Sequence, residues 1–271
     1  MTSSSYSSGI SESRTYNDDN TLAGISFTGA SIGNLTYDWD SNTNKTSESI
    51  TGTMSGYGFD VGGSGYDNED RLVNWQRSDS NLNQAWNLSL VGDWTSITEN
   101  SSTQNRTHGP THELVSVASQ SVTHDAKGNM TLIPAVLRGS SQTPQQPLKM
   151  KWDFENKLLA ADTDNDSTDD VFYKFDALGR RVARTANSAT TIYFQSGQQT
   201  IADYTAGTAA SSPTYNYVYA SYIDEPVMRS TGSSGAKHFF HRNQQYSITA
   251  ITDASGAVIE RYAYTAYGTP T

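Results

Sequence analysis

The densest group of possible metal ligands lies in one short acidic stretch near the middle of the chain. Residues 162–170 read DTDNDSTDD, with acids at the first, third and fifth positions. That spacing matches the opening of a calcium-binding loop, which surrounds the ion with oxygen ligands. However, Ser167 stands where such a loop has its turn-forming glycine, and Tyr173 stands where it has a bidentate glutamate. Two interpretations follow: a solvated acidic hairpin tip, or a weak calcium site whose ligands are Asp162, Asp164, Asp166 and Asp170.

Other patterns that resemble catalytic or metal-binding motifs lack the structure that each motif needs. Residues 29–33 read GASIG, but a serine nucleophile elbow requires a following helix, and residues 34–39 look like a strand. His108 and His112 are four apart, but Gly109 and Pro110 prevent the helix that would bring them together. We therefore expect no catalytic residue, no enzyme activity and no cofactor apart from weakly bound calcium.

The acidic stretch runs directly into the clearest β-hairpin of the sequence. Residues 171–185 read VFYKFDALGRRVART, in which β-branched and aromatic residues alternate with polar ones. Asp176 can bond its own backbone two residues on, and Gly179 can adopt a positive φ, so the pair predicts a turn followed by a bulge. Gly92-Asp93 predicts a second hairpin within residues 86–97, with a two-residue turn.

The same turn pattern recurs along the chain at irregular intervals. An acid followed three positions later by Gly, Asn or Asp occurs at Asp67, Asp125, Asp153 and Asp253, and Tyr16-Asn17-Asp18 and Tyr37-Asp38 look like degenerate copies. A solenoid would hold a fixed period, so the irregular spacing favours hairpins of unequal length in a shared sheet. No amphipathic helix of ten residues or more is evident. The sequence therefore predicts an all-β fold of irregular antiparallel β-hairpins in a twisted, curling sheet.

The repeated motif and the C-terminal part together resemble a known family. FDALGRRV at residues 175–182 and the Tyr-Asp pairs resemble YD-repeat (RHS-repeat) proteins, and HRN at 241–243, ITAITDASG at 248–256 and ERYAY at 260–264 resemble the start of an RHS-repeat-associated core. The resemblance divides the chain into a flexible N-terminus (1–14), degenerate YD-like hairpins (15–120) and a YD-repeat segment that runs into a truncated core (121–271).

The resemblance implies a structural function. Proteins of this family build hollow β-shells that enclose a toxin or another C-terminal cargo, so we expect a shell segment whose partners are upstream or downstream RHS segments or an enclosed polypeptide. Complete cores carry Asp-Pro-x-Gly motifs that support self-cleavage. Here the corresponding place reads YTAYG at residues 264–268, with Thr265 for the aspartate and Ala266 for the proline. We therefore expect no self-cleavage.

Composition limits the possible partners and location. The 271 residues carry a formal net charge of -10, which disfavours nucleic acid and anionic membranes as partners. There is no cysteine, hence no disulfide and no thiolate metal site. The start, MTSSSYSSGI, shows no signal peptide, and no apolar run is long enough for membrane insertion. With the resemblance, this predicts a secreted or cell-surface protein, of bacterial origin, whose export signal lies upstream or whose route uses none.

An alternative interpretation is an extracellular adhesion module that binds carbohydrates or proteins. Tryptophan and tyrosine side chains exposed together on one face would form the stacking platforms that such binding needs. If the aromatic side chains instead fill the buried face of the sheet, the structural interpretation is favoured. The tryptophans in question are Trp39, Trp75, Trp86, Trp94 and Trp152.

The last strands of the sequence predict an open sheet edge. A curled sheet that does not close leaves unpaired N–H and C=O groups on its terminal strands, and identical chains are the nearest partners. The strand near Ile259–Tyr264 would expose such an edge. The face expected to be partly open carries Val258, Glu260, Tyr262 and Tyr264. This predicts self-association through sheet edges, as a closed homo-oligomer or a head-to-tail filament. The alternative is a monomer whose edge is blunted by charges such as Glu260 and Arg261.

Overall fold

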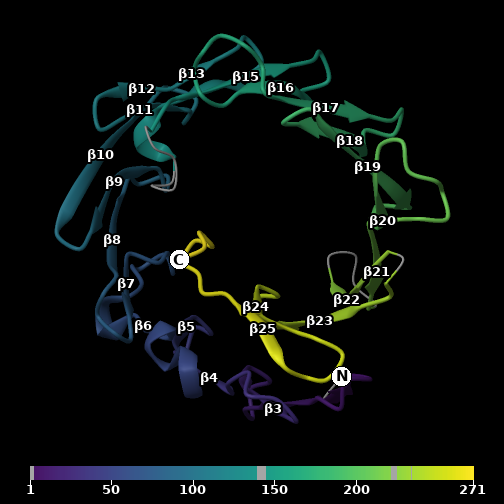
Figure 1. The fold of residues 1–271 in the computed structure, drawn as a ribbon. Helices are drawn as coiled ribbons and strands as arrows, with labels where there is room; N and C mark the ends of the chain where they lie inside the picture. The colour runs from purple at the N-terminus through teal and green to yellow at the C-terminus, as the bar shows by residue number, and fades with distance from the viewer. Residues whose placement is uncertain (1–2, 139–144, 221–224, 233) are drawn as a thin grey trace. The chain divides into compact units, whose positions relative to one another are not determined.

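Antiparallel strands joined by short loops account for most of the chain (Figure 1). This computed structural model describes residues 3–138, 145–220, 225–232 and 234–271. Within those ranges the only helical segments are three short 3-10 helices, η1 (Gly52–Tyr57), η2 (Gly62–Ser64) and η3 (Ala135–Leu137). The predicted all-β fold of irregular antiparallel hairpins is confirmed.

The first sheet contains twelve strands, each of which pairs with the next strand along the chain. This order needs only short connections, and it leaves β1 and β12 at the two ends of the sheet. The strands are β1 (Ser3–Ser5), β2 (Ser11–Tyr16), β3 (Leu22–Thr28), β4 (Leu35–Trp39), β5 (Lys45–Ile50), β6 (Phe59–Asp60), β7 (Asn74–Arg77), β8 (Asn83–Leu88), β9 (Trp94–Glu99), β10 (Ser102–His108), β11 (Leu114–Val117) and β12 (Gln120–Ser121).

The second sheet contains thirteen strands in the same sequential order, and it also does not close on itself. Its end strands are β13 and β25. The strands are β13 (Thr123–His124), β14 (Met130–Ile133), β15 (Leu148–Trp152), β16 (Leu158–Asp162), β17 (Val171–Phe175), β18 (Arg181–Ala186), β19 (Ala189–Ser196), β20 (Gln199–Thr205), β21 (Tyr215–Tyr219), β22 (Pro226–Thr231), β23 (Lys237–Arg242), β24 (Ile248–Thr252) and β25 (Val258–Arg261).

One five-residue loop design joins many of the strands, and the β17–β18 hairpin shows it in full. The Asp176 Oδ1 atom accepts hydrogen bonds from the backbone N–H groups of Leu178 and Arg180, each at 2.9 Å. Gly179 has φ +79° and donates its N–H to the Asp176 carbonyl at 3.0 Å. The register then shifts by one residue, so Phe175 pairs with Arg181. The predicted turn with a left-handed glycine and a bulge therefore forms.

The same loop recurs in both sheets. In each case the side-chain oxygen of the first residue accepts the N–H groups of the third and fifth residues, and the fourth residue has a positive φ. The first residues of such loops are Asp40, Asp67, Asp125, Asp153, Asp176, Asn243 and Asp253. Asparagine serves as well as aspartate at Asn243 because its Oδ1 atom is also an acceptor.

Three loops differ from the sequence-based expectations. The loop after Tyr37 begins at Asp40, while Asp38 lies inside β4 and accepts a hydrogen bond from Ser47. The loop after Tyr16 begins at Asn17, which accepts the backbone N–H of Asn20 on its carbonyl. The predicted two-residue turn at Gly92-Asp93 was wrong. The strands end at Leu88 and resume at Trp94, and the five residues between them make the same backbone bonds as the other loops.

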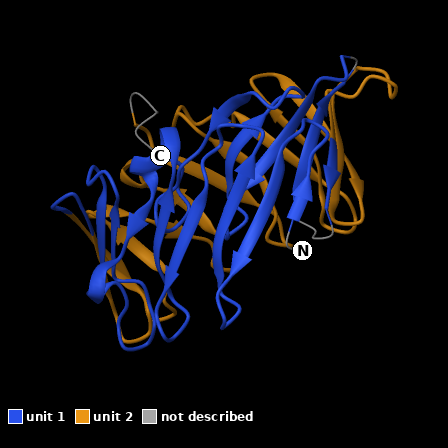
Figure 2. Cartoon of the chain, turned by 90° about the horizontal axis from the view of Figure 1, so that it is seen from below, with its two compact units in different colours: residues 1–86, 98–102, 217–271 blue, residues 87–97, 103–216 orange. Residues whose placement is uncertain are grey.

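The chain forms two compact units, coloured separately in Figure 2. Unit 1 contains residues 1–86, 98–102 and 217–271, and unit 2 contains residues 87–97 and 103–216. In unit 2, the Arg181 guanidinium carbon lies 5.8 Å from the centre of the Tyr173 ring and 5.0 Å from that of Tyr193, so the cation links neighbouring strands. Phe172 and Phe194 of the same unit are 46% and 59% exposed.

Unit 1 joins the two ends of the chain around one apolar core. Residues of β3, β4 and the neighbouring loops pack together with Ala250 of β24. Val258 of β25, which we expected on an open face, packs against this core instead. Residues 3–14, where we expected a flexible terminus, contain β1 and part of β2, because Ile10 between those strands is fully buried in this core. The buried members of the core are Ile10, Ile25, Phe27, Ile32, Leu35, Tyr37 and Ala250.

Polar contacts also connect the first and last strands of unit 1. The Tyr37 hydroxyl accepts the backbone N–H of Gln244 at 3.0 Å. The Arg261 guanidinium donates to the Ser31 carbonyl at 2.8 Å. These contacts link residues more than 200 positions apart, so the closure of unit 1 depends on the late strands reaching the early ones.

Replacing Gly128 with alanine should lower the free energy of unfolding by about 1 kcal/mol, because a Cβ atom disfavours the left-handed conformation. Gly128 has φ +86°, and nothing lies within 4 Å of an added Cβ, so the cost is conformational and not steric. Gly128→Asn should lose less, because Asn156 holds the equivalent loop position at φ +62°. Urea unfolding measures both changes.

Gly63→Ala is the matched control for this series. An added Cβ at Gly63 also meets nothing within 4 Å, but Gly63 does not have a positive φ. The control should therefore change stability little. Equal costs at Gly63 and Gly128 would contradict the left-handed requirement of the loop.

Candidate functional site: the acidic loop between β16 and β17

The acidic stretch forms the loop of the β16–β17 hairpin in unit 2. Ala161 pairs with Val171 across the two strands, and the Asp170 N–H donates to the Ala161 carbonyl at 2.8 Å. The hairpin is therefore closed directly beneath the loop, and residues 162–170 project from its end. Asp162, the last residue of β16, is only 3% exposed, whereas Asp164 and Asp166 are exposed.

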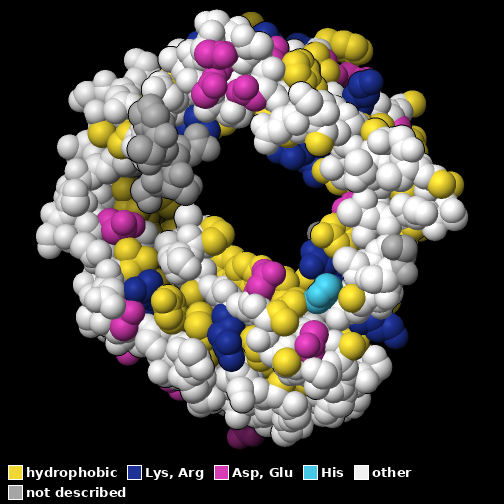
Figure 3. All heavy atoms as spheres, viewed as in Figure 1, with side chains coloured by type: hydrophobic (Ala, Val, Ile, Leu, Met, Phe, Trp, Pro, Cys, Tyr) yellow, Lys and Arg dark blue, Asp and Glu magenta, His cyan; other side chains and the backbone are white. Residues whose placement is uncertain are grey.

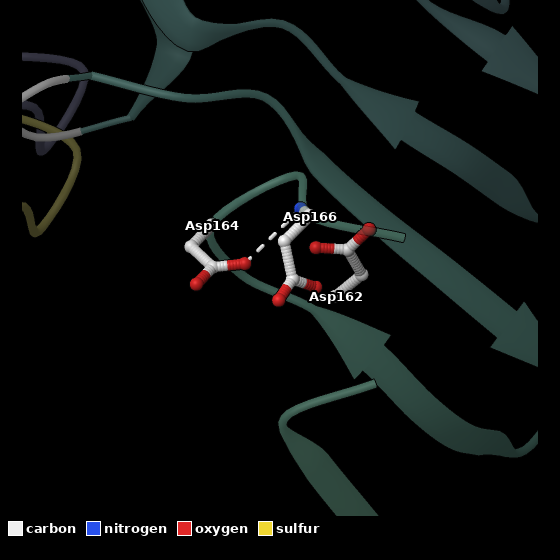
Figure 4. Close-up of side chains that lie close together, drawn as sticks. All are labelled: Asp162, Asp164 and Asp166. Atoms are coloured by element: carbon white, nitrogen blue, oxygen red, sulfur yellow. Dashed lines mark hydrogen bonds between the residues drawn. The ribbon is translucent and has the colours of Figure 1, made fainter. Parts of the chain in front are cut away.

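Three of the four predicted ligands come together. One oxygen from each of Asp162, Asp164 and Asp166 lies within 4.8 Å of the others (Figure 4). Within the described part of the chain, this is the one group of three or more His, Cys, Asp or Glu side chains close enough to share a metal ion. Alternation along the loop explains the grouping, because the first, third and fifth positions project toward the same side (Figure 4).

The fourth predicted ligand, Asp170, is engaged elsewhere. Its Oδ2 atom accepts hydrogen bonds from the Thr163 hydroxyl at 2.7 Å and the Thr163 backbone N–H at 2.6 Å. The hydroxyl bond, followed by the backbone bond, holds the pKa of the Asp170 carboxyl below its ordinary value. Asp170 therefore fixes the base of the loop and does not join the other three carboxylates.

The three clustered carboxylates also support the loop backbone. Asp162 accepts the N–H of Asn165 at 2.6 Å on one oxygen and that of Ser167 at 3.1 Å on the other. Asp164 accepts the N–H of Asp166 at 3.2 Å. These bonds hold the loop, including the positive φ of Asn165 and Ser167. A carboxylate oxygen has two lone pairs, so each group keeps some capacity for a cation.

Two lysines from the neighbouring strand β15 supply positive charge beside the loop. Lys149 Nζ lies 3.5 Å from Asp162, and Lys151 Nζ lies 2.7 Å from Asp169. Both lysines are substantially exposed, so each pair is screened by water and contributes little to stability. Lys149 nevertheless competes with a divalent cation for Asp162, whereas Lys151 pairs with Asp169 outside the cluster.

The other two motifs, GASIG at residues 29–33 and the pair His108 and His112, lie in strands and loops. The segment after GASIG is strand β4, so no helix follows Ser31 as a nucleophile elbow would require. His112 Nδ1 contacts Asp93 at 3.0 Å, which joins two hairpin loops of unit 2. In the part of the chain that the structure describes, no helix is long and apolar enough to cross a membrane.

Sequence reasoning missed a cavity of about 520 Å³ in unit 1. Lys45 and Glu48 lie in its wall, only 9% and 6% exposed, and their charged groups are 3.2 Å apart. Burial, opposed by the Glu48 charge, lowers the pKa of the Lys45 ammonium. Nothing in the local sequence signals this pair, because the cavity forms only where β4–β7 meet the C-terminal segment. Aromatic side chains line much of it: Trp39, Tyr57, Phe59, Tyr66, Trp75, Tyr262, Tyr264 and Tyr267.

Comparisons with known proteins give partial matches. No family model matches the chain. The tRNA3(Ser)-specific nuclease WapA of Bacillus spizizenii is 29% identical over 171 residues, which is 63% of this chain and 7% of that protein. The tRNA nuclease WapA of Bacillus subtilis strain 168 is 28% identical over 178 residues, or 65% of this chain and 7% of that protein. The chain is similar to RHS-type toxin proteins.

Solved structures of Tc toxin proteins also match over nearly the whole chain. The Photorhabdus luminescens Tc holotoxin pore matches with a TM-score of 0.42 and 13% identity, covering 99% of this chain and 17% of that one. The TcdB2-TccC3 complex matches with a TM-score of 0.41 and 14% identity, covering 97% of this chain and 18% of that one. The chain thus spans a small part of the length of each of these RHS-type relatives.

Calorimetric titration with calcium chloride should show weak binding or none. Asp162, Asp164 and Asp166 already accept backbone N–H groups, and Asp170 does not reach them. Two lysines further reduce the negative charge that a cation would meet. Asp169→Ala, which lies outside the three-carboxylate cluster, is the control. A sub-micromolar site that is lost in Asp164→Ala and kept in Asp169→Ala would show that the loop is a true calcium site.

Proposed function

We propose that this chain is a structural segment of an RHS-type β-shell, of the kind that encloses a toxin or another C-terminal cargo, and that it has no catalytic turnover. The observation that carries the proposal is the strand order, since every strand pairs with its sequence neighbours in two long sheets. Such a meander forms a wall and can be lengthened at either end by another hairpin. The similarity to RHS-type toxin proteins agrees with this role.

The tryptophan side chains favour the wall over the adhesion module, whereas Tyr16, Tyr246 and Tyr267 are about half exposed. Trp75 and Trp86 are 3% and 4% exposed, and the other three tryptophans are half-buried. A stacking platform needs flat aromatic faces open to solvent, and the tryptophans do not provide one. They instead contribute packing, as in the edge-on contact of Trp86 with Tyr267, whose ring centres are 5.0 Å apart.

The charge of the surface is consistent with a partner that is neither nucleic acid nor membrane. The net charge is -10, and Figure 3 shows Lys and Arg side chains dispersed in small groups over the face drawn. Nucleic-acid binding rewards a continuous basic track, because each neutralised phosphate releases counterions. As a shell segment, the protein would be secreted or displayed at a bacterial cell surface, with further RHS segments and an enclosed polypeptide as its partners.

Open sheet edges are where further segments or further copies would add. The end strands β1, β12 and β13 have three, two and two residues, and such short edges resist pairing. β25 has four residues and pairs with β24 on one side, and it has no strand neighbour on the other side among the described residues. Ile259 of β25 is 45% exposed. We therefore propose β25 as the edge through which copies of the chain associate.

Static light scattering over a range of protein concentrations tests this assembly. We expect the average mass to rise with concentration, because the N–H and C=O groups of β25 seek partners. Ile259→Lys should reduce the rise, since a charge on an edge strand blocks edge-to-edge pairing. Val91→Lys is the matched control, because Val91 is an exposed apolar residue, 67% accessible, in the β8–β9 loop. A monomeric mass for the unmodified protein at its highest soluble concentration would refute association through the edge.

A further inference from the structure

A histidine lies buried where the first and last hairpins of unit 1 meet. His241 of β23 is 0% exposed. Its ring centre lies 4.8 Å from that of Tyr6, which precedes β2, and 5.6 Å from that of Phe27 in β3. Both contacts are edge-on, so the imidazole fills an aromatic pocket that the N-terminal residues supply. The C-terminal hairpin thus places an ionisable ring inside the contact between the chain ends.

Only one nitrogen of this ring has a hydrogen-bond partner. Nε2 lies 2.9 Å from the Thr252 hydroxyl of β24, and Nδ1 is buried without a partner. A neutral imidazole tolerates this arrangement, because the unpartnered nitrogen then loses one weak acceptor bond. A protonated ring would bury a second N–H donor and a full charge with nothing to receive them. Burial, and then the charge of Arg242, lowers the pKa of His241 to about 4.

The carboxylates near His241 are already neutralised by other cations. Glu12 of β2, 4% exposed, pairs with Arg14 at 2.8 Å and also accepts a hydrogen bond from the Tyr6 hydroxyl. Glu225, which precedes β22, pairs with Arg242 at 2.7 Å. Each acid therefore has its own arginine, and an imidazolium at position 241 would add a positive charge with no counter-ion.

The other elements packed around the ring carry no compensating charge. β3 contributes Phe27, and β24 contributes Thr252 and, directly opposite His241, Ala250. On β22, Arg229 lies opposite His238, three residues from His241, and it is a further cation. The ring is thus surrounded by aromatic, aliphatic and hydroxyl groups. The cations nearby, Arg242 and Arg229, would repel an imidazolium.

We propose that His241 is an acid-sensitive latch, and that its protonation releases the β23–β24 hairpin from the N-terminal strands of unit 1. The bonds that would open with it lie in the adjoining loop, where Gln244 donates to Tyr37 and Lys45 lies 3.3 Å from Gln245. The latch follows from the packing of unit 1 alone, and it does not depend on the proposed shell function.

The pH window follows from the direction of the shift. The folded pKa of His241 lies below its ordinary value of 6.5, so its neutral form stabilises the fold fully above pH 6.5. That stability is lost as pH falls from 6.5 toward 4. The loop aspartates behave differently: hydrogen bonds lower the pKa values of Asp40, Asp125 and Asp253 from 3.8, so they protonate at more acidic pH. Comparing the unmodified protein with a His241 variant between pH 7 and 4.5 therefore isolates the contribution of His241, because every other ionisable group is common to both.

Chemical unfolding at pH 7 and pH 4.5 tests the latch. For the unmodified protein the unfolding equilibrium constant should rise on the order of 50-fold between these values, as the linkage relation gives for one such group. His241→Phe keeps the aromatic packing and removes the titrating nitrogens, so its equilibrium constant should change little. His112→Phe is the control, because His112 is 57% exposed and should leave the pH response intact. An unchanged pH response in His241→Phe would overturn the proposal.

A second measurement on the unmodified protein covers the case in which His241→Phe does not fold. Amide hydrogen exchange at pH 7 and 4.5, corrected for intrinsic rates, should show faster exchange in β23–β24 and in β2–β3. Peptides from β17–β20 of unit 2 should keep their protection and serve as the internal reference. Equal loss of protection in both units, or no change in β23–β24, would contradict a local latch at His241.

Discussion

The structure depends on a side-chain hydrogen-bond acceptor at the start of most of its five-residue loops. The Oδ1 atom of an aspartate or asparagine binds the N–H groups two and four residues later, as Asp176 does with Leu178 and Arg180. Those N–H groups would otherwise point into water at the end of the hairpin, and the side chain fixes them locally. Because each loop is self-contained, each hairpin has a set register before it packs. Two long sheets with every strand next to its sequence neighbour are the result.

The sequence predicts this loop best where both of its requirements are visible. At residues 176–179 an aspartate and a glycine stand three apart between alternating strands, and the structure confirms the turn and the bulge. At Asn243 the acceptor is an amide and the left-handed position is Tyr246, whose bulky side chain gives no signal of a positive φ. Such a loop becomes visible only from the backbone, so local propensity under-predicts the number of hairpins.

The acidic loop shows which metal ligands a sequence pattern can predict and which it cannot. Alternation correctly brings Asp162, Asp164 and Asp166 to one side, because it depends only on local geometry. The sequence does not reveal that Asp170 binds Thr163, nor that Lys149 approaches from another strand. In the same way, no local pattern indicates that residues near position 10 meet residues near position 250 in unit 1. That contact is non-local, so no short stretch of the sequence signals it.

The proposed shell role depends on local hairpins, whereas the proposed latch depends on non-local packing in unit 1. Loops that satisfy their own backbone allow a long meander to form, and open edges such as β25 allow it to be extended. The contact between chain ends in unit 1 then depends on non-local packing around Ile10, Tyr37 and His241. The packing around His241 depends on pH, because the ring can become charged. The hairpins themselves are held by short-range hydrogen bonds.

Residue-resolved amide hydrogen exchange at neutral pH tests the central claim most directly. If the side-chain acceptor organises each loop, the N–H groups of Asn129, Arg180 and Ser247 should exchange slowly, although they lie in loops. In the β20–β21 connection, the amides of Ala209 and Ala210, which are not among those that donate to backbone carbonyls there, should exchange quickly. The Arg180 amide should lose its protection in Asp176→Ala and keep it in Asp176→Asn, because the asparagine Oδ1 atom is still an acceptor. Exchange at Asn129, Arg180 and Ser247 as fast as at Ala209 and Ala210 would contradict the central claim.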